Sequence, residues 1–180
     1  FQSIFLRIKY RIFSKTVFYV SDTMEFNTGK SYPGASNSNI FLDEKNILTV
    51  VSKTNKKVIY KPYPSRQYYA NRLSFLYDHI KHFKNFFFFQ EEEDFRYVRS
   101  LANIIITQAN ESTLEWCIGS EVPLVYLESS KYNSLKDDKV IEVFKKSFFF
   151  FNCDYENWEK DLLDFLNLPM NTIDRLWKEK

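Results

Sequence analysis

The sequence predicts the α/β class, with a parallel sheet of about six strands covered by helices on both faces. Short runs rich in Val, Ile, Tyr and Phe alternate along the chain with longer segments of helical periodicity. The 180 residues, 44% of them hydrophobic, suffice for one substantial core and are few for two. The run Ile104-Ile105-Ile106 has the β-branched character of a strand that is buried on both faces.

The chain divides into an N-terminal segment, residues 1–15, and an α/β domain, residues 16–180. Apolar residues of the segment are interleaved with Arg7, Lys9 and Arg11, so it is too short and too charged for a membrane-spanning helix. We expect an amphipathic helix or a connection there. Peripheral association with the inner face of a membrane stays open.

The elements expected up to residue 83 are a strand at 16–20, a helix at 40–54, a strand at 57–61 and a helix at 66–83. A loop that holds the Gly and Pro residues of this region joins the first strand to the first helix. Pro62 and Pro64 end the second strand because proline cannot donate to a ladder. In the second helix Leu73, Leu76 and Ile80 fall on one face.

The elements expected after residue 85 are a strand at 86–89, a helix at 91–101, a strand-helix-strand unit at 103–128, a helix at 137–146, a strand at 147–152 and helices at 155–166 and 171–178. The two phenylalanine tracts, 86–89 and 148–151, are expected to be buried core strands, because Phe favours strands and each tract is flanked by charge. Trp116, in the helix of the strand-helix-strand unit, is expected to pack in the core, the alternative being a platform on which a base stacks.

Charge, cysteines and motifs disfavour several classes. The formal net charge is +2, from 25 basic and 23 acidic side chains spread along the chain, which gives little support for a nucleic-acid partner. Cys117 and Cys153 lie far apart without Cys or His neighbours at metal-ligand spacing, so we expect no zinc site, no disulfide and a cytoplasmic setting. No Gly-x-Gly-x-x-Gly, P-loop or Gly-x-Ser-x-Gly motif occurs, which argues against dinucleotide oxidoreductases, P-loop NTPases and α/β-hydrolases.

The strongest candidate site lies within the strand-helix-strand unit. Glu111, Ser112 and Thr113 stand where the chain leaves the carboxyl end of a strand and enters a helix. Free backbone N–H groups and the positive helix end meet there, which is a typical setting for a phosphate. Ser112 and Glu115 also fit a capping box, which needs no ligand, and the two interpretations are compatible.

Two further loops are expected at the same edge of the sheet, because ligands of open parallel sheets collect outside the carboxyl ends of the strands. In the loop at 29–39, Gly34 and Ser36 leave room for a ligand to approach the backbone, although an ordinary turn explains them equally well. In residues 61–65 (KPYPS), the lysine brings a cation to a strand end and the prolines direct Tyr63 to the cleft. The alternative is that these prolines only end the strand.

The order strand, Lys-Pro-Tyr-Pro, helix, strand, helix precedes the pattern I-I-I-T-x-x-x-x-S-T-L-x-W-x-x-G-x-x-x-P-L-V-Y-L. This arrangement resembles the C-terminal, nucleotide-sugar-binding half of GT-B glycosyltransferases that build bacterial surface polysaccharides such as LPS or capsule. The resemblance spans residues 57–128 and is nearest in style to the surface-carbohydrate transferases related to capsule Kdo transferases and bacterial sialyltransferases. It implies a Rossmann-like domain.

In that family a His-Pro pair after a strand contacts the donor nucleotide, and a Ser-Ser or Ser-Thr pair at a helix start holds its phosphate. By position the first pair becomes Tyr63-Pro64, in which a phenol replaces the usual His and carries no charge at neutral pH. Glu128 is placed where a carboxylate could accept ribose hydroxyls, the alternative being an exposed loop acid. The donor-binding residues predicted in this way are Gly34, Ser36, Lys61, Tyr63, Pro64, Ser65, Glu111, Ser112, Thr113 and Glu128.

The resemblance implies a sugar-nucleotide donor, with a CMP-linked acidic sugar favoured by the relatives, and a glycan or lipid-linked acceptor. No metal or other cofactor is expected, since Ser112, Thr113 and Lys61 would stabilise the departing phosphate. GT-B enzymes carry the acceptor site on an N-terminal domain for which 180 residues leave no room, so we expect a further domain to complete the enzyme. The alternative is a non-catalytic α/β module that binds a phosphorylated ligand or a protein partner.

Overall fold

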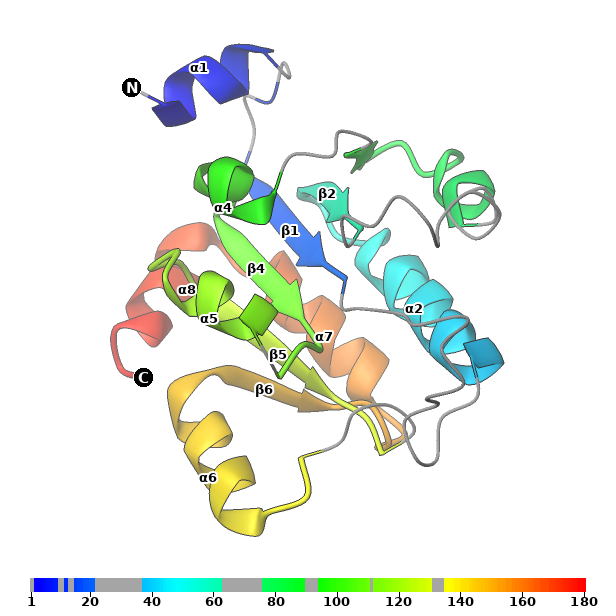
Figure 1. The fold of residues 1–180 in the computed structure, drawn as a ribbon, viewed down its shortest axis with the longest axis vertical. Helices are drawn as coiled ribbons and strands as arrows, with labels where there is room; N and C mark the ends of the chain where they lie inside the picture. Colours follow the sequence, from blue (N-terminus) through cyan, green and yellow to red (C-terminus); the bar gives the residue numbers. More distant parts are fainter. Residues whose placement is uncertain are drawn as a thin grey trace.

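A computed structural model describes residues 2–9, 12, 15–21, 37–62, 76–89, 94–110, 112–130 and 135–180. These residues form a six-stranded sheet in which neighbouring strands are all parallel. The strands are β1 Thr16–Val20, β2 Lys57–Lys61, β3 Phe86–Phe88, β4 Ile104–Thr107, β5 Leu124–Glu128 and β6 Phe149–Asn152. Helices lie against both faces (Figure 1), so the predicted α/β, Rossmann-like fold is confirmed.

The helices agree with the expected elements, apart from shifts of a few residues at their ends. Their bounds are α1 Gln2–Lys9, α2 Asn37–Val51, α4 Phe95–Val98, the short 3₁₀ helix η1 Arg99–Leu101, α5 Ser112–Ile118, α6 Asp138–Ser147, α7 Trp158–Asn167 and α8 Met170–Trp177. Residues 76–80 are also helical, and the part of the expected helix at 66–75 lies outside the described residues.

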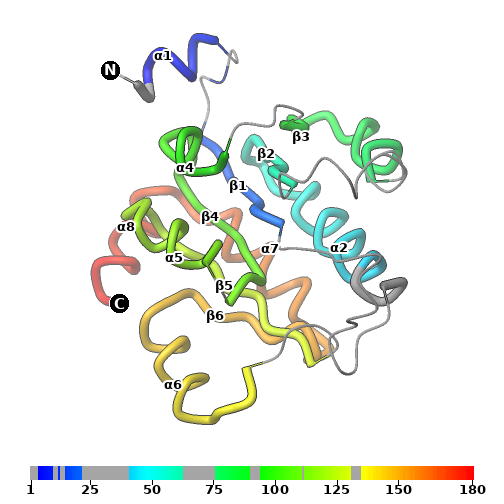
Figure 2. Tube along the Cα trace, in the orientation of Figure 1, coloured from blue at the N-terminus to red at the C-terminus, as the bar shows by residue number. Residues whose placement is uncertain are grey.

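The strand order is β3-β2-β1-β4-β5-β6, which can be followed along the tube in Figure 2. From β1 the chain builds outward through β2 to β3, returns to the other side of β1 at β4, and builds outward again to β6. The order therefore reverses between β1 and β4, where Val20 pairs with Thr107 and the two carboxyl ends are level. Ligands of open α/β sheets bind in the crevice at such a switch point.

Two cores fill the space between the sheet and its helices. One core packs under α2, α7 and α8, and the other packs under α1, α4, η1 and α5. Every residue of β1, β4 and β5 is buried, which explains why these strands show continuous apolar runs instead of an alternating pattern. The central strands thus form a rigid base for the loops at their carboxyl ends.

The two phenylalanine tracts form the edge strands β3 and β6, so the expectation that these strands are buried on both faces is wrong, although the terminal residues Phe89 and Phe148 of the tracts are buried. Each residue of both strands is only half-buried. An open sheet has two edges, and large rings cover an edge well: the Phe149 ring lies 4.5 Å from the Phe165 ring of α7. Composition alone cannot separate an edge strand from a central one, because Phe suits both positions.

Candidate functional site

A small cavity of about 120 Å³ lies at the switch point. The residues that line it come from the ends of β1 and β2 and from the starts of α4 and α5: Val20, Ser21, Pro62, Asp94, Phe95, Ser112, Thr113 and Trp116. Four segments that are distant in sequence therefore converge at the carboxyl edge of the sheet, where the topology predicts a ligand.

Thr107 holds the loop between β4 and α5 in place. Its hydroxyl donates to the carbonyl oxygen of Val20 at 3.2 Å and accepts the N–H of Ala109 at 3.0 Å. After this buried anchor the chain turns into α5, and the turn places an exposed Ser112 and a half-buried Thr113 at the rim of the cavity. The α5 helix includes Ser112 as its first residue, one position later than the N-cap role expected of it.

A carboxylate, a guanidinium and an indole lie close together at this cavity. Asp94 caps α4 by accepting the N–H of Arg96 at 2.9 Å, and it also pairs with the Arg96 Nη2 at 2.7 Å. The hydrogen bond from the Arg96 side chain lowers the pKa of Asp94, so the acid is held as a carboxylate. The guanidinium carbon of Arg96 in turn lies 4.9 Å from the ring centroid of Trp116.

Trp116 lies at the surface, and the expectation that it packs in the core is wrong. Its side chain is 39% exposed. Leu114 and Cys117, three positions apart, are the buried residues of α5 and define its inner face, and Trp116 lies off that face. The spacing of the two buried residues was the signal in the sequence that could have placed the indole correctly.

Lys61 is at the end of β2 as expected, but its side chain is buried. It is 2% exposed, and its Nζ lies 5.4 Å from the ring centroid of Phe89. Pro62, the next residue, lines the cavity, and Lys61 does not. The positive charge of Lys61 contributes to the lowered pKa of Asp94, so the lysine acts on the site electrostatically although it does not line the cavity.

Glu128 is buried at the end of β5, with 7% of its surface exposed, and is not an exposed loop acid. It lines a second, larger cavity of about 730 Å³, which shares no lining residue with the first. Its Oε1 accepts the N–H of Leu135 at 2.9 Å. Burial raises the pKa of Glu128 to about 7 despite that bond, and the nearby charge of Asp154 also raises it. The structure therefore places Glu128 apart from Ser112 and Thr113.

The other predicted donor-binding residues lie outside the part of the chain that the structure describes. They are Gly34, Ser36, Tyr63, Pro64, Ser65 and Glu111. Their expected roles stay predictions.

A group of buried polar side chains on the α2 side of the same edge was not predicted from the sequence. The Tyr60 hydroxyl donates to Glu44 Oε1 at 2.7 Å, and the Tyr19 hydroxyl lies 3.4 Å from Gln108 Oε1. The two tyrosine rings stack with centroids 5.8 Å apart, because Tyr19 and Tyr60 are register partners in β1 and β2. The sequence did contain a signal for this group: Tyr19 and Tyr60 are each the next-to-last residue of a strand.

The chain matches no protein-family model and no curated protein. Within the described ranges, no group of three or more His, Cys, Asp and Glu side chains is arranged to hold a metal ion. Those ranges also contain no helix with the length and apolar character needed to cross a bilayer. The geometry of the carboxyl edge is therefore the basis for inferring function.

Proposed function

We propose that this domain binds the phosphate of a sugar nucleotide at the switch point and serves as the donor-binding domain of a glycosyltransferase. One observation carries the proposal. Ser112 and Thr113, in the first turn of α5, line an open cavity at the place where strand order reverses. The fold alone is compatible with many functions, so the proposal depends on this corner and on the sequence resemblance that includes it.

The size of the cavity decides which part of the donor it would hold. About 120 Å³ is well below the roughly 300 Å³ at which small-molecule pockets begin. A phosphate group fits such a volume and a whole nucleotide does not. The nucleoside would therefore extend over the surface, where the exposed indole of Trp116 offers an apolar face to a base.

The donors around the cavity suit a phosphate that gains negative charge, and Arg96 offsets the carboxylate of Asp94 that also lines the cavity. The hydroxyls of Ser112 and Thr113 and the unpaired N–H groups of a helix start donate hydrogen bonds to phosphate oxygens. The Arg96 guanidinium lies against Trp116, which lines the cavity, and a phosphate would share it with Asp94. These donors stabilise the leaving group more than the bound substrate, which is what accelerates the reaction.

In the proposed reaction, a hydroxyl of the acceptor attacks the anomeric carbon of the donor sugar and loses its proton to a base. The bond between that carbon and the phosphate oxygen breaks, and the nucleotide leaves with the bonding electrons. The acceptor, the base and closure over the sugar are assigned to a further domain, as in the GT-B enzymes that the sequence resembles. A CMP-linked acidic sugar and a glycan or lipid-linked acceptor remain the favoured substrates, at the inner face of the membrane.

The test is calorimetric titration of the chain with CMP, CDP, UDP and GDP. We expect one base to be preferred, and the double variant Ser112→Ala with Thr113→Val to bind it roughly tenfold more weakly or worse, because two hydroxyl donors are lost. The matched control is Ser147→Ala with Thr172→Val, which removes the same two hydroxyl types from α6 and α8. The control should leave affinity unchanged.

Two results would count against the transferase. Equal affinity in the Ser112 and Thr113 double variant and in the native chain would remove the phosphate site from this corner. Inorganic phosphate that binds as tightly as every nucleotide would favour a non-catalytic phosphate-binding module, because a donor domain must also recognise the base.

A further inference from the structure

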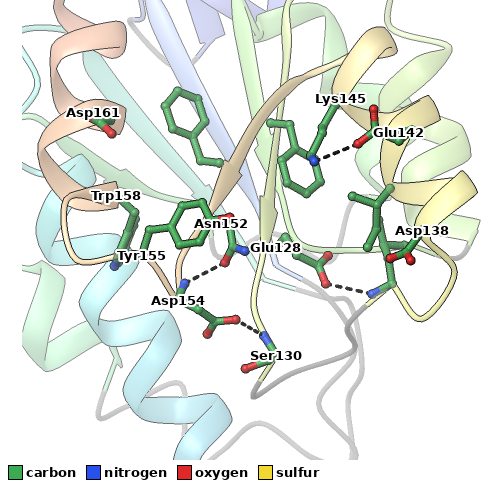
Figure 3. A pocket seen from close by; sticks show the side chains of 14 residues that line it. Glu128, Ser130, Asp138, Glu142, Lys145, Asn152, Asp154, Tyr155, Trp158 and Asp161 are labelled. Carbon is green, nitrogen blue, oxygen red and sulfur yellow. Dashed lines mark hydrogen bonds and ion pairs between the residues drawn. The ribbon is translucent and has the colours of Figure 1, made fainter.

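The larger cavity, about 730 Å³, lies between the carboxyl ends of β5 and β6 and the helices α6 and α7 (Figure 3). Its volume falls in the range of roughly 300 to 1,000 Å³ that is typical of small-molecule sites. Among the residues expected to bind the donor nucleotide, Glu128 lines this cavity, and Ser112 and Thr113 do not. The cavity is therefore a separate candidate for a ligand.

The lining of the cavity is strongly acidic. The carboxylates that line it are Glu128, Asp138, Glu142, Asp154 and Asp161. Lys145 also lines it, and its Nζ pairs with Glu142 at 2.9 Å. Excess negative charge in a concave surface repels phosphates and concentrates cations. The chain as a whole carries a net charge of +2, so this acidic surface is local.

Glu128 is the independent sign that the cavity is a binding site. The residue is 7% exposed, and its Oε2 is buried without a hydrogen-bond partner among the described residues. The other oxygen accepts the N–H of Leu135, which leaves the carboxyl group with capacity for one further partner. Buried polar atoms are seldom left unpaired, and an exception of this kind commonly marks a functional group. In Figure 3 the Glu128 carboxyl lies between Asn152 and Asp138, among the side chains that line the cavity.

Aromatic and apolar side chains complete the surface. Tyr155, which is 71% exposed, and the half-buried Trp158 lie at one side of the cavity, and Phe150 and Ile141 also line it. Aromatic faces attract organic ammonium groups, and apolar side chains accept a methylene chain. Asp154 is held beside them, since its carboxylate accepts the N–H of Ser130 at 2.9 Å.

We propose that this cavity binds a small alkylammonium ligand with two or more charges. One ammonium group pairs with Glu128 and Asp154, the methylene chain lies against the aromatic surface, and a second ammonium group faces the carboxylates of α6 or α7. The site is independent of the nucleotide site proposed above.

Binding of a cation is linked to the protonation of Glu128. The titratable groups that line the cavity with Glu128 are Asp154 after β6, Asp138 and the Glu142–Lys145 pair on α6, and Tyr155 and Asp161. The pKa of Glu128 is about 7, so part of the population is protonated at neutral pH. A bound ammonium group favours the ionised form. Binding of the ligand therefore releases a proton from Glu128, and the affinity for the ligand increases from about pH 6 to about pH 8.

The experiment is titration of the chain with putrescine and spermidine at constant ionic strength, in two buffers with different enthalpies of ionisation. Glu128→Gln keeps the acceptor for Leu135 and removes the charge; it should weaken binding roughly tenfold or more and abolish proton release. Glu159→Gln makes the same change on α7, at a residue that does not line the cavity, and should bind like the native chain. Butanediol, a neutral analogue of putrescine, should not bind.

Unchanged affinity in Glu128→Gln, an equal loss in Glu159→Gln, or equal binding of butanediol would each overturn the proposal, as would no binding of either amine. Tyr155→Ala is a second variant that does not affect the core, because its ring is mostly exposed. It should weaken binding severalfold, and full affinity in this variant counts against the site. Titration of Glu128→Gln with CMP separates the two proposals: lost nucleotide affinity supports the predicted ribose role of Glu128 and contradicts a separate amine site.

Discussion

The Tyr60 hydroxyl donates a 2.7 Å hydrogen bond to Oε1 of Glu44 and so joins strand β2 to helix α2. Both side chains are buried, Tyr60 at 1% and Glu44 at 2% exposure. Burial, followed by the negative charge of Glu44, raises the pKa of Tyr60 well above its usual range, so the phenol stays protonated and remains a donor. The bond ties α2 to the carboxyl edge of the sheet, where both candidate sites lie.

Tyr60→Phe should lower the free energy of unfolding by about 1 to 3 kcal/mol, because the carboxylate of Glu44 then stays buried with one donor fewer. Urea denaturation at neutral pH measures the change. Tyr155→Phe removes a hydroxyl from a ring that is 71% exposed and should stay within about 0.5 kcal/mol of the native chain. Similar effects of the two variants would show that the Tyr60 bond does not stabilise the fold.

Lys56 caps the C-terminal end of α7. Its Nζ donates to the carbonyl oxygen of Leu168 at 2.8 Å and to that of Leu166, and the side chain is buried at 8% exposure. These carbonyl groups have no partner within the helix, and the negative helix end favours a cation. Burial lowers the pKa of Lys56, because desolvation of the ammonium group offsets part of its favourable interaction with the helix end.

Lys56→Met keeps the aliphatic chain and removes the donor, so we expect a loss of about 1 to 2 kcal/mol in the free energy of unfolding. Lys53→Met is the matched control, because Lys53 is exposed in the same connection between α2 and β2. Thermal or urea unfolding compares the two. If Lys53→Met costs as much as Lys56→Met, the cap contributes nothing specific.

The parts of the fold that could be predicted from the sequence are those that depend on local residue patterns, such as runs of apolar residues. The central strands β1, β4 and β5 are continuous apolar runs, and the corner at Ser112 and Thr113 follows directly from where such a run ends. The edge positions of β3 and β6 were not predictable, because strand order depends on which helices cover which strand. A Phe run carries no information on that order.

The parts of the site that were missed depend on contacts between distant segments. Asp94 and Arg96 meet Trp116 because α4 and α5 are neighbours on one face of the sheet. Glu128 is the last residue of its strand, as Lys61 is of β2, but the order of the strands brings it to a different cavity from Ser112. Residue spacing within a single segment cannot predict these relationships.

Glu121 adopts a left-handed backbone conformation, with φ at 55°, in the turn that follows α5. That region is unfavourable for residues with a Cβ atom and suits glycine. Glu121→Gly should therefore raise the free energy of unfolding by about 0.5 to 1 kcal/mol. Glu115→Gly, within α5, should lower it by about 1 kcal/mol, because glycine is a poor helix former. Equal losses in both variants, measured by urea denaturation, would contradict the strain assigned to Glu121.

The raised pKa of Glu128 makes the stability of the fold depend on pH. The pKa is about 7 in the folded chain against 4.5 for the unperturbed group, and desolvation is the main cause. Because the folded state binds the proton more tightly, the contribution of Glu128 is fully present below about pH 4.5 and is lost as the pH rises through about 7. Water in the open cavity reduces the effect, so we expect the loss to be on the order of 2 kcal/mol.

Glu128→Gln cannot ionise, so its free energy of unfolding should lack this decrease. The difference between the variant and the native chain reports on Glu128 and on its coupling to Asp154, because the titrations of groups far from Glu128 cancel. We expect the free energy of unfolding of the variant to increase relative to that of the native chain between about pH 4.5 and about pH 8. Above that range the difference should change little. Glu159→Gln, which removes an exposed carboxyl group of α7 outside the cavity, is the control against which the Glu128 variant is compared. A flat difference for Glu128→Gln would mean that the carboxyl group is hydrated, and that its burial does not raise the pKa.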